Sequence, residues 1–479
     1  MTQFKEITLK YFPYLLYLVL GLLCLNNCFF QDMVQLSSKH ASWFYDNNFK
    51  YFLFPEVIDS GHPPLNGILL ASWWKILGKT LWSSHLFILL WSLLLIYQVQ
   101  KLSKLFFSEK VTFFVSLVIL LDPTLLSQSV IVSPDIILLT FFFMAIRACF
   151  EKKSLVLMLS ICFLSLISTR GMMCTAIVYF FYQFYNYLED NKTFSLKRFI
   201  FRSLPFLPGV LLALSYLGFH YYKLGWVGYH DDMPWASCFE KVDFMGFLRN
   251  IVVVIWRFLD FGRIILWILL FYTLFMFFKL RKTNKVHFNN KEKSLFLLLG
   301  LLLLCFSYSA LLHKMLSGHR YFLPHFLMFA FIVFTLLSKI VSVRRMKRLS
   351  IVVCIVLLCG NFIKYPEKIS TGWDSTLSHL PFYSLRTQMF DYIVDNNISF
   401  SDVSSGFAIK GNQNYIDLTS PKDLNIDGYQ GDKKYHIYSN VFNATDEEIE
   451  EINNPQKYKQ LTMMKKGNVF MGLYEKITE

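Results

Sequence analysis

Residues 11–32 read YFPYLLYLVLGLLCLNNCFFQD, an uncharged apolar run that ends in an acid, Asp32. The hydrocarbon core of a bilayer, about 30 Å thick, is crossed by about 20 helical residues, so this run is long enough to span a membrane. Lys5 and Lys10 precede it, and no small-residue cleavage site follows it. We therefore expect an uncleaved first span that begins in the cytoplasm and carries Asp32 to the outer surface.

The composition extends this expectation to most of the chain. Of its 479 residues, 54% are hydrophobic and 18% are aromatic, which is more apolar surface than a soluble domain needs. The formal net charge of +14 would also suit a nucleic-acid-binding protein. However, the basic residues form short clusters between apolar runs, as cytoplasmic loops of membrane proteins do, and no nucleic-acid motif stands out. The sequence thus predicts a polytopic α-helical membrane protein.

Apolar runs and basic clusters together predict about eleven transmembrane helices. They are expected at 11–30, 85–106, 111–126, 136–150, 154–168, 172–188, 204–222, 264–278, 294–312, 321–338 and 349–363. Two further helices, 64–78 and 250–261, are expected to lie in the membrane interface, the first anchored by Trp73 and Trp74. With two outer loops, 31–84 and 223–263, these segments make up a predicted membrane domain over residues 1–363.

The tail, residues 364–479, differs from the rest of the chain in carrying more acidic than basic residues. The positive-inside rule therefore places it outside the cytoplasm. Segments 435–438 and 469–474 predict strands, and 446–452 predicts a short helix. We expect a small extracytoplasmic α+β domain, which cannot be held by disulfides because it lacks cysteine, and we find no catalytic motif in it.

Ionisable residues at the ends of spans are costly and are therefore candidates for function. In the predicted topology the candidates all lie on the outer side: Asp32, Asp59, His62, Asp135, Arg170, His230, Asp231, Asp232, His319 and Arg320. Residues with purely local roles would be scattered over both sides. Each residue alone still has an ordinary explanation, such as a helix-end acid facing water, an acid in a first helical turn, or a snorkelling arginine.

Their chemistry suggests roles. Asp32 would be partly desolvated at the membrane interface, which would strengthen it as a general base. Arg170 interrupts an apolar stretch and Arg320 begins a span, and guanidinium groups suit phosphate. His230 lies in an aromatic loop suited to a sugar, and His230 and Asp232 could join a divalent-metal site with Asp59. No HExxH, P-loop or GxGxxG motif is present, and nothing in the sequence requires a metal.

Several short motifs occur here in the order in which they occur in a known group of enzymes. They are an acid after the first span (Asp32), Asp-x-x-His-Pro-Pro-Leu (59–65), Ser-Pro-Asp (133–135), Thr-Arg-Gly (169–171) and Arg-Tyr-x-x-Pro (320–324). Over roughly residues 10–340 the chain resembles the type C glycosyltransferases (GT-C fold). These are polytopic enzymes that use polyprenyl-phosphate sugars and include protein O-mannosyltransferases and aminoarabinose transferases.

The resemblance implies an inverting glycosyltransferase at the outer face of the bilayer. The composition, rich in Lys, Asn and Phe, and the expected lack of disulfides favour a bacterial inner membrane over an endoplasmic reticulum. A hexosyl- or pentosyl-type sugar would pass from a polyprenyl-phosphate donor to a hydroxyl of a glycan, lipid or protein. The resemblance makes Asp32 the base and makes Arg170 and Arg320 the groups that stabilise the leaving phosphate. The remaining candidates, Asp59, His62, Asp135 and His230, would shape the donor site.

Three alternatives belong to other classes. A transporter or flippase for a lipid-linked glycan would place its substrate-binding groups near the bilayer midplane, whereas the candidates here gather on one side. A scaffold that only presents the tail would need none of these acids. A polymerase or ligase of another membrane-enzyme class would share the many spans but is not expected to combine an acid after the first span with a Pro-Pro step.

Overall fold

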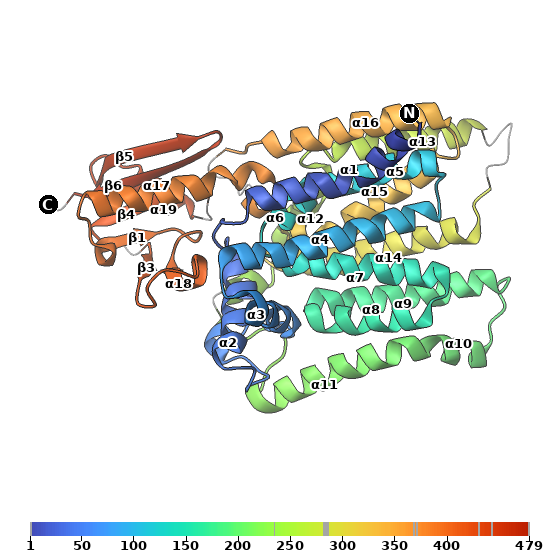
Figure 1. Ribbon diagram of the computed structural model, residues 1–479, viewed down its shortest axis with the longest axis horizontal. Helices are drawn as coiled ribbons and strands as arrows, with labels where there is room; N and C mark the ends of the chain where they lie inside the picture. Colours follow the sequence, from blue (N-terminus) through green and yellow to red (C-terminus); the bar gives the residue numbers. More distant parts are fainter. Residues whose placement is uncertain are drawn as a thin grey trace.

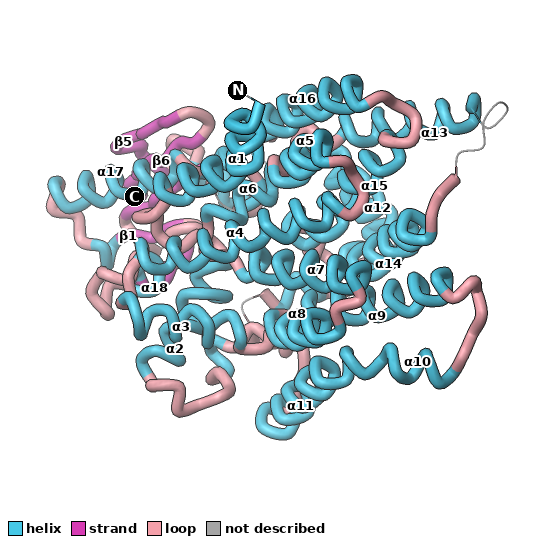
Figure 2. The backbone as a smooth tube through the Cα atoms, turned by 45° about the vertical axis from the view of Figure 1, so that its right-hand side comes forward, coloured by secondary structure: helices cyan, strands magenta, loops and turns pink. Residues whose placement is uncertain are grey.

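The computed structural model describes residues 2–233, 235–280, 287–366, 369, 372–429, 432–441 and 444–477. A large helical bundle makes up the N-terminal part, and a small domain with a sheet lies at one end of it (Figure 1). The same division between helices and strands is seen after rotation (Figure 2). The main helices of the bundle are α1 (Thr2–Leu23), α4 (Leu81–Lys104), α5 (Glu109–Leu120), α6 (Pro123–Val130), α7 (Pro134–Glu151), α8 (Ser154–Ile167), α9 (Thr169–Glu189), α10 (Leu196–Ser203), α11 (Leu207–Leu224), α12 (Phe244–Leu259), α13 (Ile264–Leu280), α14 (Asn290–Leu312), α15 (Leu323–Leu337) and α16 (Val343–Cys359).

Four helical segments of the described chain are long and apolar enough to cross a membrane. They are Leu81–Lys104, Leu196–Leu224, Asn290–Leu312 and His319–Leu337, and the number rises to six if each of two bent helix pairs counts as one span. The bent pairs are α5 with α6, at 69°, and α12 with α13, at 86°. A set of eleven crossings therefore remains a prediction.

The expected continuous span 111–126 is wrong, because the helix breaks between α5 and α6. Pro123 stands at the first position of α6, where a missing N–H costs nothing. The Asp122 carboxylate caps this new helix by accepting hydrogen bonds from the backbone N–H groups of Thr124 (3.0 Å) and Leu125 (3.2 Å). Asp-Pro is a helix-start signal, which the apolar residues around it concealed.

The predicted outer loop 31–84 is largely helical. It contains a π-helix (Val34–Lys39), α2 (His40–Asp46) and α3 (Leu65–Leu77). Trp74 was expected to anchor α3 in the membrane interface, but it is fully buried in protein and its indole N–H donates to Ser84 Oγ at 2.8 Å. Trp73 similarly donates to the Ser83 carbonyl at 2.9 Å. These tryptophans join α3 to the start of α4.

The C-terminal part carries a six-stranded sheet in the order β2-β3-β1-β4-β6-β5. Its strands are β1 (Val403–Ser405), β2 (Gly411–Asn412), β3 (Asn425–Gly428), β4 (Tyr435–Ser439), β5 (Tyr458–Lys466) and β6 (Val469–Lys476), and its helices are α17 (Pro381–Asp395), α18 (Gln413–Ile416) and α19 (Asp446–Ile452). β1 pairs in parallel with β3 and β4, while β6 is antiparallel to β4 and β5. The predicted strands and short helix are confirmed.

This domain packs directly on the segment that follows α1. The Phe29 N–H donates to the Ile416 carbonyl at 2.8 Å, and Ser38 Oγ donates to the Tyr415 carbonyl at 2.6 Å. The Phe30 ring stacks on the His379 ring at 4.9 Å. Since buried residues from both parts form one apolar cluster, the division at residue 364 stays a prediction.

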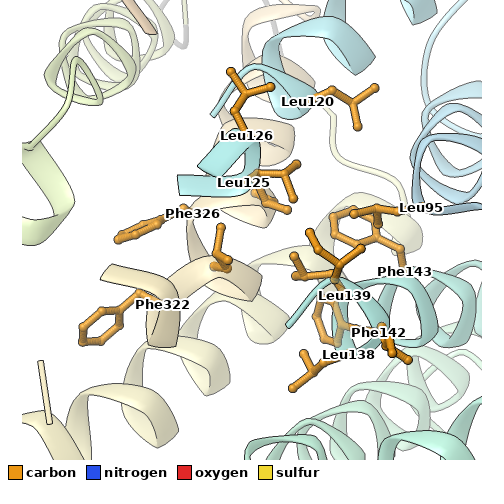
Figure 3. Packing of buried hydrophobic residues seen from close by; sticks show 14 of the residues in the cluster. Leu95, Leu120, Leu125, Leu126, Leu138, Leu139, Phe142, Phe143, Phe322 and Phe326 are labelled. Atoms are coloured by element: carbon orange, nitrogen blue, oxygen red, sulfur yellow. The ribbon is translucent and has the colours of Figure 1, made fainter. Parts of the chain in front are cut away.

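Apolar side chains pack around α6, the helix that follows the break. Leu125 and Leu126 of α6 belong to the same buried apolar cluster as Leu139 of α7 and Phe326 of α15 (Figure 3). All four are at most 2% exposed. Close packing at this level fixes the ends of α6, α7 and α15 relative to one another. Those ends carry the charged residues described next.

Candidate active site

Four of the residues predicted to act come from segments far apart in the sequence. Asp32 follows α1, Asp135 lies in the first turn of α7, Arg170 in the first turn of α9, and Arg320 in the 3₁₀ helix His319–Phe322 that leads into α15. Ser133 and Ser168 cap α7 and α9, each accepting a hydrogen bond from a backbone N–H of the first turn. Capping therefore fixes where each helix begins and so where its charged residue stands.

The structure brings these four residues together. Arg320 Nη2 donates to Asp32 Oδ2, and Arg320 Nη1 lies 3.9 Å from Asp135 Oδ2. Arg170 Nη2 lies 2.6 Å from Asp135 Oδ1. Asp135 thus stands between two guanidinium groups. Four of the ten predicted candidates therefore lie in one cluster, and their roles stay predictions.

The Tyr321 ring lies beside the guanidinium groups of both Arg170 and Arg320. The guanidinium carbon of Arg170 lies 4.8 Å from the ring centroid, and that of Arg320 lies 5.1 Å from it. Cation–π attraction of this kind holds a guanidinium in place without occupying its N–H groups. Arg170 Nη1 also approaches the Arg320 carbonyl at 3.4 Å. The two arginines are therefore held as a pair.

A fifth charged residue, Asp374, comes from the tail, where no catalytic motif was expected. It lies in the 3₁₀ helix Trp373–Ser375, and its Oδ2 is 3.3 Å from Arg320 Nε. Burial raises the pKa of Asp374, the nearby Asp32 and Asp135 raise it further, and Arg320 opposes them. Its local sequence, Gly-Trp-Asp-Ser, gives no signal that would place it here. We call Asp32, Asp135, Arg170, Arg320 and Asp374 the charged cluster.

Exposure differs sharply within the charged cluster. The Arg320 side chain is 5% exposed and that of Asp135 is 3% exposed, whereas that of Asp32 is 38% exposed. Within the described chain, Arg320 Nη1 and Asp135 Oδ2 are buried and have no hydrogen-bond partner. These two atoms face each other at 3.9 Å, which is too long for a hydrogen bond, so they attract each other as an ion pair between buried charges. The accessible carboxylate of Asp32 is the one that a substrate can reach.

His62 lies beside the charged cluster. It lines a small cavity together with Pro134 and Arg170, and its Nδ1 is 3.1 Å from Thr169 Oγ1. Burial, reinforced by Arg170, lowers the pKa of His62 to about 3. The imidazole is therefore neutral at pH 7, and it contributes shape and hydrogen bonding rather than charge.

Asp59 has no described contact with the charged cluster. Its Oδ2 is 3.0 Å from His220 Nε2 on α11, and its Oδ1 accepts a hydrogen bond of 2.8 Å from the Gly61 N–H. His220 Nδ1 in turn contacts the Trp226 carbonyl at 2.9 Å. Asp59 therefore ties the Pro-Pro segment to α11 and to the loop that follows it.

His230 belongs to the same outer layer. Its ring lies 4.5 Å from the Trp226 ring, and its described contacts do not reach the charged cluster. Across the described ranges no three His, Cys, Asp or Glu side chains gather closely enough to hold a metal ion. Both carboxylate oxygens of Asp59 already have protein partners.

A second network behind Arg320 had not been predicted. His319 Nε2 lies 2.8 Å from Asp260 Oδ2, and the Tyr365 hydroxyl donates to Asp260 Oδ1. The Phe261 N–H donates to the same oxygen at 2.7 Å. This network fixes the residue next to Arg320. His319 was predicted only as a member of the outer group, and its acidic partner lies at the bend between α12 and α13, which the sequence does not mark.

The close contact between Gly61 and Gly228 gives a testable prediction. Gly61 has φ +68°, and a Cβ there would lie 1.9 Å from the Gly228 carbonyl oxygen. Gly225 has φ +80° but open space around it. Alanine at either site strains the backbone. Only Gly61→Ala should also displace the loop that carries Gly228, and it should lower the catalytic rate measured in membranes by roughly tenfold. Equal activities of Gly61→Ala and Gly225→Ala in membranes would contradict this.

Two solved structures share this architecture. The crystal structure of ArnT from Cupriavidus metallidurans bound to undecaprenyl phosphate has a TM-score of 0.53 and 9% identity, covering 96% of this chain and 97% of that chain. This chain has the fold of ArnT. The structure of ArnT in the apo state has a TM-score of 0.51 and 12% identity, covering 77% of this chain and 67% of that chain. No protein-family model and no curated protein matches the chain. The predicted GT-C-like helical fold with a small C-terminal sheet is therefore confirmed, whereas the count of eleven membrane spans stays a prediction.

Proposed function

We propose that this protein is a membrane glycosyltransferase that moves a sugar from a polyprenyl-phosphate donor to an acceptor hydroxyl. The observation that carries the proposal is the pairing of Arg170 and Arg320 with Asp32 in one cluster. Two guanidinium groups suit a phosphate, and the accessible carboxylate beside them suits a base. The fold supports the donor class, because ArnT with this fold is seen bound to undecaprenyl phosphate.

The ion pairs suggest how donor binding prepares the base. In the structure Asp32 Oδ2 accepts a hydrogen bond from Arg320 Nη2, so this oxygen is engaged by the arginine and is not free to meet a substrate hydroxyl. A donor phosphate that takes up the Arg320 N–H groups would release Asp32. The donor would then create the base that its own transfer requires.

The transfer itself is a single displacement. Asp32 takes the proton of the acceptor hydroxyl as the oxygen forms a bond to the anomeric carbon. The bond from that carbon to the phosphate oxygen breaks, and its electron pair leaves with polyprenyl phosphate, so the configuration inverts. Arg170 and Arg320 stabilise the charge that develops on the phosphate. The sugar is hexosyl- or pentosyl-type, and the acceptor is a glycan, lipid or protein.

The proposed setting is a bacterial inner membrane crossed about eleven times, with the N-terminus in the cytoplasm and the charged cluster at the outer face. α7 and α9 both begin at the charged cluster and have 18 and 21 residues. At about 1.5 Å per residue they end roughly 30 Å away. Basic residues such as Lys152 and Lys192 follow those ends, as cytoplasmic loops require. A divalent metal stays a proposal.

The test is transfer of a radiolabelled sugar from its polyprenyl-phosphate carrier in membranes. Arg170→Met should lower transfer about 100-fold, because one preorganised group on the developing charge is lost. The control is Arg249→Met. Arg249 is exposed, and within the described residues its side chain donates one hydrogen bond, from Nη2 to the Lys314 carbonyl at 3.4 Å. Unchanged transfer in Arg170→Met would contradict the phosphate role. Movement of intact donor across the membrane by wild type would favour the transporter.

A further inference from the structure

Asp374 gives the charged cluster one carboxylate more than its arginines can neutralise. Asp32, Asp135 and Asp374 all face Arg320, while Arg170 is the second guanidinium group. The resting cluster is therefore anionic by one charge when all five groups are ionised. A phosphate entering it meets attraction from two arginines and repulsion from whichever carboxylates remain beside them.

The three carboxylates differ in their freedom to move away. Asp32 is the most exposed of them and lies at the start of the helical segment that continues into the π-helix Val34–Lys39. Asp374 is anchored, because its carbonyl accepts a hydrogen bond of 2.8 Å from Gln128 Nε2 and its Oδ1 accepts one of 3.1 Å from Ser375 Oγ. Ser375 is fully buried and Trp373 nearly so. Asp374 therefore stays in place when a phosphate arrives.

The segment after Asp374 fastens it further. The Leu377 N–H donates to Asn361 Oδ1 at 2.9 Å, and the Ser378 hydroxyl donates to the Asn361 carbonyl. His379 stacks on Phe30, two residues before Asp32. These contacts hold the Asp374 carboxylate in a fixed position beside Arg320.

Resting on the proposed function, we propose that Asp374 is a positioning residue that favours release of the polyprenyl-phosphate product. The donor is a phosphodiester with a single negative charge, whereas the product is a monoester with about −1.5 to −2 at pH 7. A fixed carboxylate on the Nε edge of Arg320 repels the product more strongly than the donor. The C-terminal domain would therefore contribute to turnover from within the active site.

The test measures binding of undecaprenyl phosphate to the purified full-length protein in detergent or nanodiscs. Asp374→Asn should tighten binding by at least tenfold, because Coulomb repulsion between two charges several ångströms apart, at an effective dielectric constant of about 20, corresponds to more than a factor of ten in the dissociation constant. Asp374→Glu, which keeps the charge, should bind like wild type. A purely structural role predicts the opposite direction, since a damaged site binds more weakly.

A matched ion pair in the same domain supplies the control. Arg386 Nη2 lies 3.3 Å from Asp417 Oδ2, with side chains 8% and 17% exposed, against 5% and 18% for Arg320 and Asp374. Asp417→Asn should leave the dissociation constant unchanged. If Asp374→Asn does not fold, Asp374→Ser takes its place in the same comparison.

The outcomes separate the inference from the proposed function. Binding by wild type that Asp374→Asn and Asp374→Ser leave unchanged or weaken would overturn the inference alone. No binding of undecaprenyl phosphate by wild type would overturn the proposed donor and the inference with it. Tighter binding in Asp374→Asn but not in Asp417→Asn is the result that we expect.

Discussion

Asp32→Asn should reduce sugar transfer about 1,000-fold, in the middle of the range for loss of a general base. The amide has nearly the same shape as the carboxylate and its oxygen can still accept a hydrogen bond from Arg320. However, it cannot take a proton from an acceptor hydroxyl. Binding of the polyprenyl phosphate should persist, because the two arginines remain. The measurement is release of radiolabelled sugar from its lipid carrier, alongside lipid binding and expression level.

The control for this variant is an acid outside the charged cluster. Asp46 lies at the end of α2, and its side chain is 55% exposed while pairing with Lys79 at 3.3 Å. Asp46→Asn should transfer sugar like wild type. If Asp32→Asn kept full activity, the base would have to be another group, and Asp374 and Asp135 would be the carboxylates to test next.

The sequence predicted most of the charged cluster because its members obey a global rule. Positive-inside topology assigns every loop to a side of the membrane, and Asp32, Asp135, Arg170 and Arg320 all fall on one side. Helices that begin on the same side of a bundle bring their first residues together. No knowledge of side-chain packing was needed for this step.

Asp374 could not be found in the same way. The tail is a polar domain, in which an exposed acid has little effect on stability. The burial of Asp374 against Arg320 therefore becomes visible only in the folded structure, where the tail packs on the helical bundle. His220 and Asp260 were not predicted for a related reason. Each is the partner of a predicted residue, Asp59 or His319, and has no unusual local sequence. Topology predicted which residues meet at one face, whereas tertiary packing decides which of them touch.

Helix breaks were the other limit of sequence analysis. Hydropathy alone predicted one continuous span through Asp122 and Pro123. An acid followed by Pro is nevertheless a recognisable helix N-terminus. Trp74 was misplaced because tryptophan suits both a membrane interface and a protein core. In both cases a local signal with two physical explanations was assigned to the membrane.

Asp122→Ala should destabilise the protein by about 4 kcal/mol, which is typical when one partner of a buried pair is removed. Asp122 Oδ2 lies 2.7 Å from Arg263 Nε, and Asp122 Oδ1 accepts a second bond of 2.7 Å from Nη2, with side chains 6% and 2% exposed. The guanidinium also lies 3.9 Å from the Phe326 ring centroid. Removing the carboxylate would leave a buried charge without its counter-ion and would uncap α6.

Denaturant unfolding in detergent micelles is the measurement, with an exposed ion pair as the comparison. Lys104 and Glu109 are 3.4 Å apart with side chains 45% and 88% exposed, so Glu109→Ala should change stability by less than about 1 kcal/mol. The double variant Asp122→Ala/Arg263→Met should recover part of the loss, because no unpaired charge remains. If Asp122→Ala alone were as mild as Glu109→Ala, the buried pair would not hold the break between α5 and α6. The helix ends behind the charged cluster would then be fixed by apolar packing alone.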